Sequence, residues 1–146
     1  MSLADWAKNG WLRPHTPTRE EIANLFEIVE RDLKDATAQG LSDDWKFGIA
    51  YNAALKLCTI LLHSSGYRPE KNLAHFRTLQ ALPEILGSKH KENADYLDAC
   101  RKKRNETEYD FAGGVSAEEV SELLAFCQQL RTEAKAWLKQ RFPKLV

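Results

Sequence analysis

Apolar residues recur at helical spacing along nearly the whole chain, and no stretch shows the sustained alternation expected of a strand. Gly, Pro and capping residues divide this pattern into segments. The sequence therefore predicts an N-terminal helix at about Leu3–Asn9, an unstructured connector at Trp11–Pro17, and five further helices. These helices are expected at about Thr18 to Gly40, Ser42 to Ser65, Leu73 to Leu82 with a bent continuation to Leu86, Lys89 to Tyr109, and Ser116 to Pro143.

The segment after Ser42 is apolar on more than one side, which is typical of a helix at the centre of a bundle. Four long helices with short connections favour an all-α fold, an antiparallel four-helix up-and-down bundle with one or two additional short helices. We expect a single domain over residues 1–146, with its core at about 18–142 and with residues 1–17 forming a short helix and a connector. The four tryptophans stand towards helix ends, where we expect them to pack against the ends of the bundle.

The composition of the chain excludes several classes of protein. The chain has 146 residues, with 21 basic and 21 acidic side chains. A net charge of zero excludes a globally basic nucleic-acid coat, although a local basic patch can still attract an anion. No apolar run is long enough to span a bilayer, and no secretory signal is recognised. Three well-separated cysteines are interpreted as reduced core thiols of a cytoplasmic protein. Clustered Cys/His spacing and cofactor motifs are missing, so neither a metal nor a cofactor is expected.

One residue in the segment Lys89–Tyr109 is a candidate for a functional role. Helical projection places Arg104 on the same strip as the apolar residues Leu97 and Cys100. A partly buried guanidinium needs a carboxylate, carbonyl groups or an anionic ligand. Two interpretations remain open: Glu108, four residues on, pairs with Arg104, or the planar guanidinium binds a phosphate.

The surroundings of Arg104 are cationic. Arg101, Lys102 and Lys103 precede it and Asn105 follows it. This run is either a solvated helix face or a phosphate-binding surface. On the preceding segment, His75 and Arg77 are accessory candidates for the same site.

These segments resemble a known family. The central helix AYNAALKLCTILLHSSGYR (50–68), the segment NLAHFR (72–77) and the segment YLDACRKKRNETEYD (96–110) together resemble the HEPN domain, a nucleotide-binding helical bundle of higher eukaryotes and prokaryotes. The resemblance covers about residues 20–140. It implies a homodimer that brings two motifs together across a cleft. In active members it implies a metal-independent RNase centre, and in many cases a toxin paired with a nucleotidyltransferase-like antitoxin.

The family motif is an Arg, a polar residue and then a His four to six residues further on. Arg104 and Asn105 fit the first two places, but the third falls on Tyr109, Asp110 or Phe111. Imidazole suits acid–base work near neutral pH, whereas a phenol with a pKa near 10 is a poor base. Tyr109 takes the catalytic place beside Arg104 only as a hydrogen-bond donor or a stacking surface.

Three functions follow from these observations. The first is an RNA- or nucleotide-binding protein of HEPN type with weak or lost RNase activity, in which Arg104 grips phosphate. The second is a non-catalytic adaptor whose basic run docks on a nucleotidyltransferase-like or other acidic protein. The third is an active metal-independent endoribonuclease. Two Arg104 side chains facing each other across a dimer axis would repel unless an anion or an acid such as Glu108 lies between them.

Overall fold

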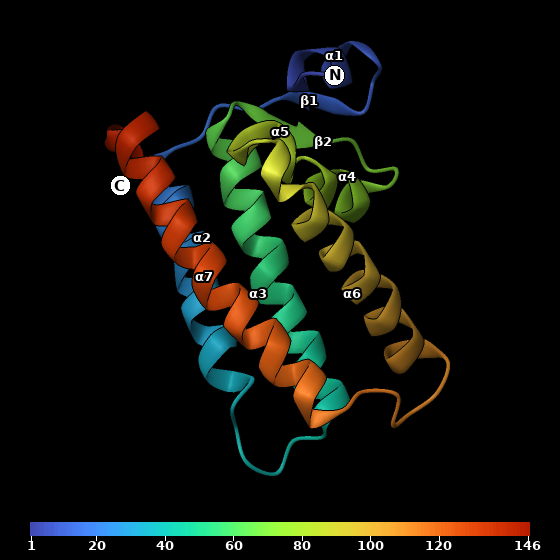
Figure 1. Cartoon of the computed structure of the whole chain (residues 1–146). Helices are drawn as coiled ribbons and strands as arrows, with labels where there is room; N and C mark the ends of the chain where they lie inside the picture. Colours follow the sequence, from blue (N-terminus) through green and yellow to red (C-terminus); the bar gives the residue numbers. More distant parts are fainter.

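A computed structural model describes all 146 residues (Figure 1). The four long helices are α2 (Arg19–Asp35), α3 (Asp43–Ser64), α6 (Lys91–Tyr109) and α7 (Ala117–Arg141). The shorter elements are α1 (Leu3–Lys8), α4 (Ala74–Gln80), α5 (Leu82–Leu86), the 3-10 turns η1 (Ser88–His90) and η2 (Pro143–Leu145), and two strands, β1 (Leu12–Pro14) and β2 (Tyr67–Pro69). The all-α prediction is confirmed, and none of the helices combines the length and apolar character that crossing a lipid bilayer requires.

Three predicted helix starts, those of α2, α3 and α7, are confirmed by their caps, whereas α6 begins at Lys91 after a 3-10 turn and has no side-chain cap. The side chains of Thr18, Ser42 and Ser116 each accept a hydrogen bond from the backbone N–H three residues on, which satisfies a donor that the helix leaves free. At the Ser116 cap the Glu119 carboxylate in turn accepts a hydrogen bond from the Ser116 N–H, which completes a capping box. These short motifs fix where these three helices begin.

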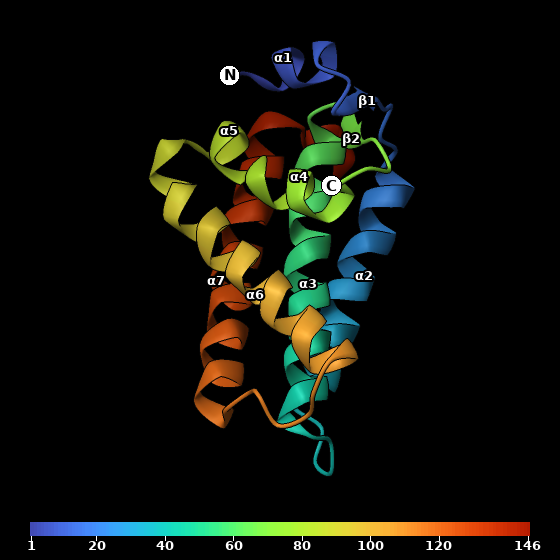
Figure 2. The same ribbon diagram turned by 90° about the vertical axis from the view of Figure 1, so that its right-hand side faces the viewer.

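Helix α3 lies at the centre of the fold. It packs mainly against α2 and α7 and to a lesser extent against α6 (Figures 1 and 2). Twelve of its residues are buried, which agrees with its predicted central place. Helix α6 approaches α7 through side chains such as Tyr96 and Phe126, whose ring centroids lie 5.1 Å apart. The three cysteines are free and buried, as expected.

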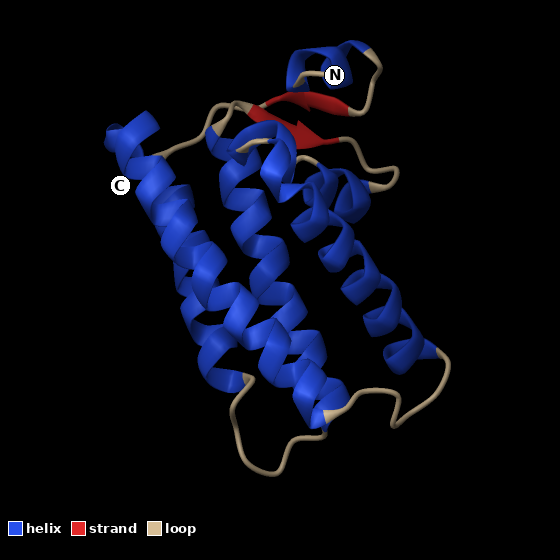
Figure 3. Cartoon of the chain, in the orientation of Figure 1, coloured by secondary structure: helices blue, strands red, loops and turns tan.

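The connector at residues 11–17 was predicted without regular structure, and this prediction is wrong. β1 pairs antiparallel with β2, with Arg13 opposite Arg68 (Figure 3). Each strand spans three residues and ends in a proline, so alternation cannot show in the sequence. Trp6 and Trp11 meet edge to face at 5.9 Å and close this end of the helices.

A second correction concerns the end of α2. Gly40 was expected directly after the helix, but α2 ends at Asp35 with Ala36 as its C-cap. Gly40 has a φ of +87° and belongs to the following loop. The loop thus contains a glycine-dependent turn that lies several residues beyond the last helical residue.

Candidate functional site

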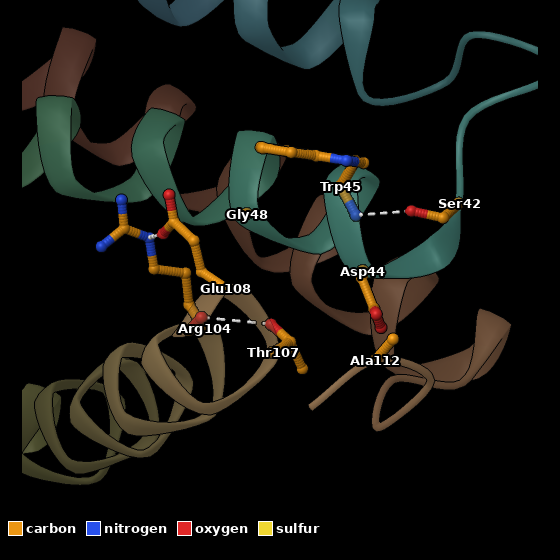
Figure 4. Close-up of a pocket in the computed structure, with 8 residues that line it drawn as sticks. All are labelled: Ser42, Asp44, Trp45, Gly48, Arg104, Thr107, Glu108 and Ala112. Atoms are coloured by element: carbon orange, nitrogen blue, oxygen red, sulfur yellow. Dashed lines mark hydrogen bonds and ion pairs between the residues drawn. The ribbon is translucent and has the colours of Figure 1, made fainter. Parts of the chain in front are cut away.

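A cavity of about 290 Å³ opens where α3 begins and α6 ends. Its walls come from the first turns of α3, from the last turns of α6 and from the loop that follows α6 (Figure 4). The lining residues are Ser42, Asp44, Trp45, Gly48, Arg104, Thr107, Glu108 and Ala112. Arg104 is the only cationic side chain among them, so the charge anomaly noticed in the sequence lies in a hollow of the surface.

Arg104 is held within its own chain. Its Nε lies 2.9 Å from a Glu108 carboxylate oxygen, and its Nη1 donates to the Asn105 side-chain oxygen at 3.2 Å. The Arg104 side chain is 28% exposed, which agrees with the predicted partial burial. The two interpretations of Arg104 are therefore compatible, because the guanidinium pairs with Glu108 and also faces the cavity.

The other cations of the run are paired as well. Arg101 and Lys102 both contact Asp98, at 2.8 and 3.5 Å. Lys103 reaches across to Glu119 at the start of α7 and lowers the pKa of that carboxyl. Acids of the same chain therefore neutralise most of the positive charge of this run. The contacts do not describe a strongly positive phosphate-binding face over residues 101–105.

A buried phenol lies behind Arg104. Tyr51 of α3 is 1% exposed, and its hydroxyl has no hydrogen-bond partner. The Arg104 guanidinium carbon lies 5.9 Å from the Tyr51 ring centroid. Burial raises the pKa of Tyr51, with the charges of Arg101 and Arg104 opposing the rise. The hydroxyl is therefore neutral, and Tyr51 is not among the residues that line the cavity.

His75 of α4 lies on the same side of the molecule as the two arginines. Partial desolvation and the positive charges of Arg104, Lys56 and Arg101 lower the pKa of its imidazole. The ring is therefore neutral at pH 7. His75 was predicted as an accessory residue of the site, and its imidazole lies within electrostatic range of Arg104.

Arg77 is engaged elsewhere. Its guanidinium carbon lies 3.9 Å above the Trp11 ring, where it holds the N-terminal segment against α4. Tyr109 is 72% exposed at the end of α6 and is absent from the cavity lining. The structure therefore does not bring Arg77 or Tyr109 together with Arg104 inside one protomer.

Among the cavity residues that sequence reasoning missed, Trp45 and Gly48 shape the site most directly. Trp45 was expected to pack against an end of the bundle, but its side chain is 60% exposed and lines the cavity. Gly48 leaves the α3 wall bare, and a Cβ there would lie 3.9 Å from Arg104 Cγ. Trp45 lies in the first turn of α3, next to the polar residues that begin the helix. These polar neighbours were the one feature of the sequence that could indicate its exposure.

Asp44 fastens the loop beside the cavity. One of its carboxylate oxygens accepts a hydrogen bond of 2.8 Å from the Gly113 N–H, and the other is buried without a partner. Phe111 of the same loop is 57% exposed. The loop thus contributes an aromatic side chain to the outer surface next to the cavity.

No protein-family description, no curated protein and no solved structure matches this chain. The geometry of its residues is therefore the ground for assigning a function. The cavity residues do not form a metal-ligand set; the one group of close His and Glu side chains lies at the other end of α3.

Proposed function

We propose that this chain is a HEPN-like RNA- or nucleotide-binding protein that takes one nucleotide unit into the cavity at Arg104. The carrying observation is the pairing, in one hollow of about 290 Å³, of a partly exposed guanidinium with an exposed indole. A guanidinium suits phosphate oxygens and an indole suits the face of a base. The volume is near the lower end for ligand pockets, which run from about 300 Å³, and it therefore favours a small ligand.

Phosphate binding requires Arg104 to exchange partners. An exposed pair between residues four apart on a helix contributes only about 0.3–0.5 kcal/mol, whereas a charge-assisted bond to phosphate contributes about 1.5–3 kcal/mol. Glu108 also lies in a last helical turn without basic residues, where the helix dipole disfavours its charge. Glu108 is therefore a weakly held partner of the guanidinium. In this proposal Asn105 orients the guanidinium.

The cations around the site have a secondary role. Lys102 is 68% exposed and supplies long-range attraction that weakens with salt. Arg101 and Lys103 form ion pairs with acids of the same chain, so their main role is structural. A homodimer, implied by the resemblance, would be compatible with the charges, because Glu108 lowers the repulsion between two copies of Arg104.

Metal-independent RNA cleavage is the enzymatic form of this proposal. The predicted catalytic pair of Arg104 and Tyr109 lacks an imidazole, but His75, whose pKa is lowered in part by the charge of Arg104, offers a neutral imidazole that can accept a proton. Cleavage of a structured RNA in the presence of EDTA that is lost in both Arg104→Ala and His75→Gln supports this form. Cleavage that is unchanged in both variants contradicts it.

The test of binding uses a fluorescent single-stranded RNA and anisotropy at two salt concentrations. Arg104→Ala should weaken binding about tenfold or more and reduce the salt slope. Lys91→Ala is the matched control, because it removes one exposed, acid-paired cation from the opposite end of the same helix. Equal binding by wild type and both variants, or no wild-type binding at low salt, contradicts the proposal.

A second candidate function is the non-catalytic adaptor. The exposed rings of Trp45, Tyr109 and Phe111 lie on neighbouring segments at one end of the molecule and favour a protein partner. Partner capture through an acidic surface is less favoured, since the basic run is already paired. We place either function, including one as a toxin–antitoxin component, in the cytoplasm, where buried free thiols persist.

A further inference from the structure

Three metal-ligating side chains converge at the end of α3 that lies away from the cavity. His15 follows β1, Glu21 stands in the first turn of α2 and His63 in the last turn of α3. One ligand atom from each lies within 4.8 Å of the others. His15 Nε2 is 2.9 Å from both Glu21 carboxylate oxygens, and His63 Nδ1 is 3.2 Å from one of them.

The backbone fixes this convergence. The pairing of β1 with β2 extends by a hydrogen bond of 2.9 Å from the His15 N–H to the Gly66 carbonyl, which holds His15 beside the end of α3. The Thr18 cap bonds the Glu21 N–H and orients the first turn of α2. The positions of the three side chains therefore follow from elements that form for other reasons.

The three side chains are only partly accessible to solvent. The side chains of His15 and His63 are each 15% exposed, and that of Glu21 is 30% exposed. Neutral imidazole and ionised carboxylate are the forms that bind a metal.

The two nitrogen-to-oxygen spacings are close to those around a tetrahedral ion. Ligands about 2.0 Å from Zn²⁺ at tetrahedral angles lie about 3.3 Å apart, and the two nitrogen-to-oxygen distances here are 2.9 and 3.2 Å. The two rings are tilted by 49° with centroids 4.4 Å apart, so they are not stacked face to face. Imidazole with a single carboxylate favours Zn²⁺ and similar ions over Mg²⁺ and Ca²⁺.

We propose that His15 Nε2, His63 Nδ1 and a Glu21 carboxylate oxygen bind one Zn²⁺ ion, with a water molecule as the fourth ligand. The ion replaces the protons that the two imidazoles share with Glu21. It would tie the connector before α2 to the end of α3. Residue spacing does not reveal this site, because His63 follows Glu21 by 42 residues in the chain.

The test is Zn²⁺ titration by calorimetry of the untagged, metal-stripped chain, with Co²⁺ absorption as a spectroscopic check and Mg²⁺ as a control ion. The proposal expects one Zn²⁺ per chain, a higher Tm with Zn²⁺, and a tetrahedral Co²⁺ spectrum. Mg²⁺ should produce none of these changes.

Variants decide which residues are the ligands. His63→Gln and Glu21→Gln should each weaken Zn²⁺ binding at least tenfold, and Glu21→Gln preserves side-chain size if His63→Gln does not fold. Glu20→Gln is the matched control, since it removes the neighbouring exposed carboxylate and should bind Zn²⁺ like the wild type. The proposal is overturned if the wild type does not bind Zn²⁺, or if folded Glu21→Gln binds it equally well.

Discussion

The Arg104 guanidinium and the Glu108 carboxylate lie 2.9 Å apart on successive turns of α6, at the edge of a cavity. The acid stands on the C-terminal side of the base, which is the weaker orientation for an ion pair on a helix. The pair thus neutralises Arg104 without holding it strongly. A phosphate that reaches the cavity competes with a weak partner.

Glu108→Gln should therefore raise RNA affinity at least about twofold, because it removes the competing carboxylate. It should also stabilise the last turn of α6, where the helix dipole disfavours acids. Glu106→Gln is the matched control, since Glu106 is an exposed acid nearby that does not line the cavity. Anisotropy measures both affinities. Equal gains in the two variants would indicate a general charge effect and contradict displacement of Glu108.

Gly48 offers a steric test of the cavity. A Cβ at this position makes an ordinary contact of 3.9 Å with Arg104 Cγ, so Gly48→Ala should fit and should stabilise α3 by about 0.5–1 kcal/mol. Gly48→Leu fills part of the hollow and should abolish RNA binding. Chemical denaturation and anisotropy provide the two measurements. Full binding by folded Gly48→Leu would show that the ligand does not enter this cavity.

Tyr51→Phe separates stability from binding. The Tyr51 hydroxyl is buried without a partner, a condition that costs about 1–3 kcal/mol. Its removal should therefore raise the free energy of unfolding by about 1 kcal/mol and leave RNA binding unchanged, because Tyr51 does not line the cavity. Urea denaturation checks the first effect. A loss of stability would mean that the hydroxyl has a partner in solution.

The His63 site should make stability depend on pH. The folded-state pKa of His63 is lowered by burial, by His15 and by Arg68, and Glu21 opposes this change. A proton therefore binds the unfolded chain more readily, so this contribution to stability is present above pH 6.5 and is lost as the pH falls. We expect the Tm, measured without Zn²⁺, to fall on acidification from pH 7.5 to 5.5. His63→Gln should flatten that dependence, and an unchanged slope would contradict it.

The thiols should be inert in the folded chain. Burial raises the pKa of Cys58 to about 12, of Cys127 to about 12 and of Cys100 to about 11. Thiolate, the reactive form, is therefore scarce at neutral pH. A chromogenic disulfide reagent should modify the three cysteines only when the chain unfolds. Rapid modification of the folded chain would contradict their burial.

Local patterns in the sequence were enough to predict the helices. The caps at Ser42 and Ser116 and the apolar stripes are contained within a few residues, and α3 and α7 begin where those caps indicate. The two strands could not be predicted, since each spans three residues and is defined by its pairing with a distant segment. The end of α2 was misplaced because Gly40 serves a loop turn instead of the helix end.

The candidate site was partly predictable for the same reason. Arg104 and Glu108 lie one turn apart on a single helix, so periodicity alone predicted both partial burial and a pairing partner. Trp45 and Gly48 are brought to Arg104 by the packing of α3 against α6, which no spacing within one segment encodes. The acids that neutralise Arg101 and Lys103 follow the same division, with Asp98 close in sequence and Glu119 distant.

The two ends of the chain lie at the same end of the helices, opposite the loop that joins α6 to α7 (Figure 1). A fluorophore, surface linker or fused domain attached at Met1 or Val146 would therefore point away from Arg104. Immobilising the molecule by either terminus would leave its Trp45 face open to solution.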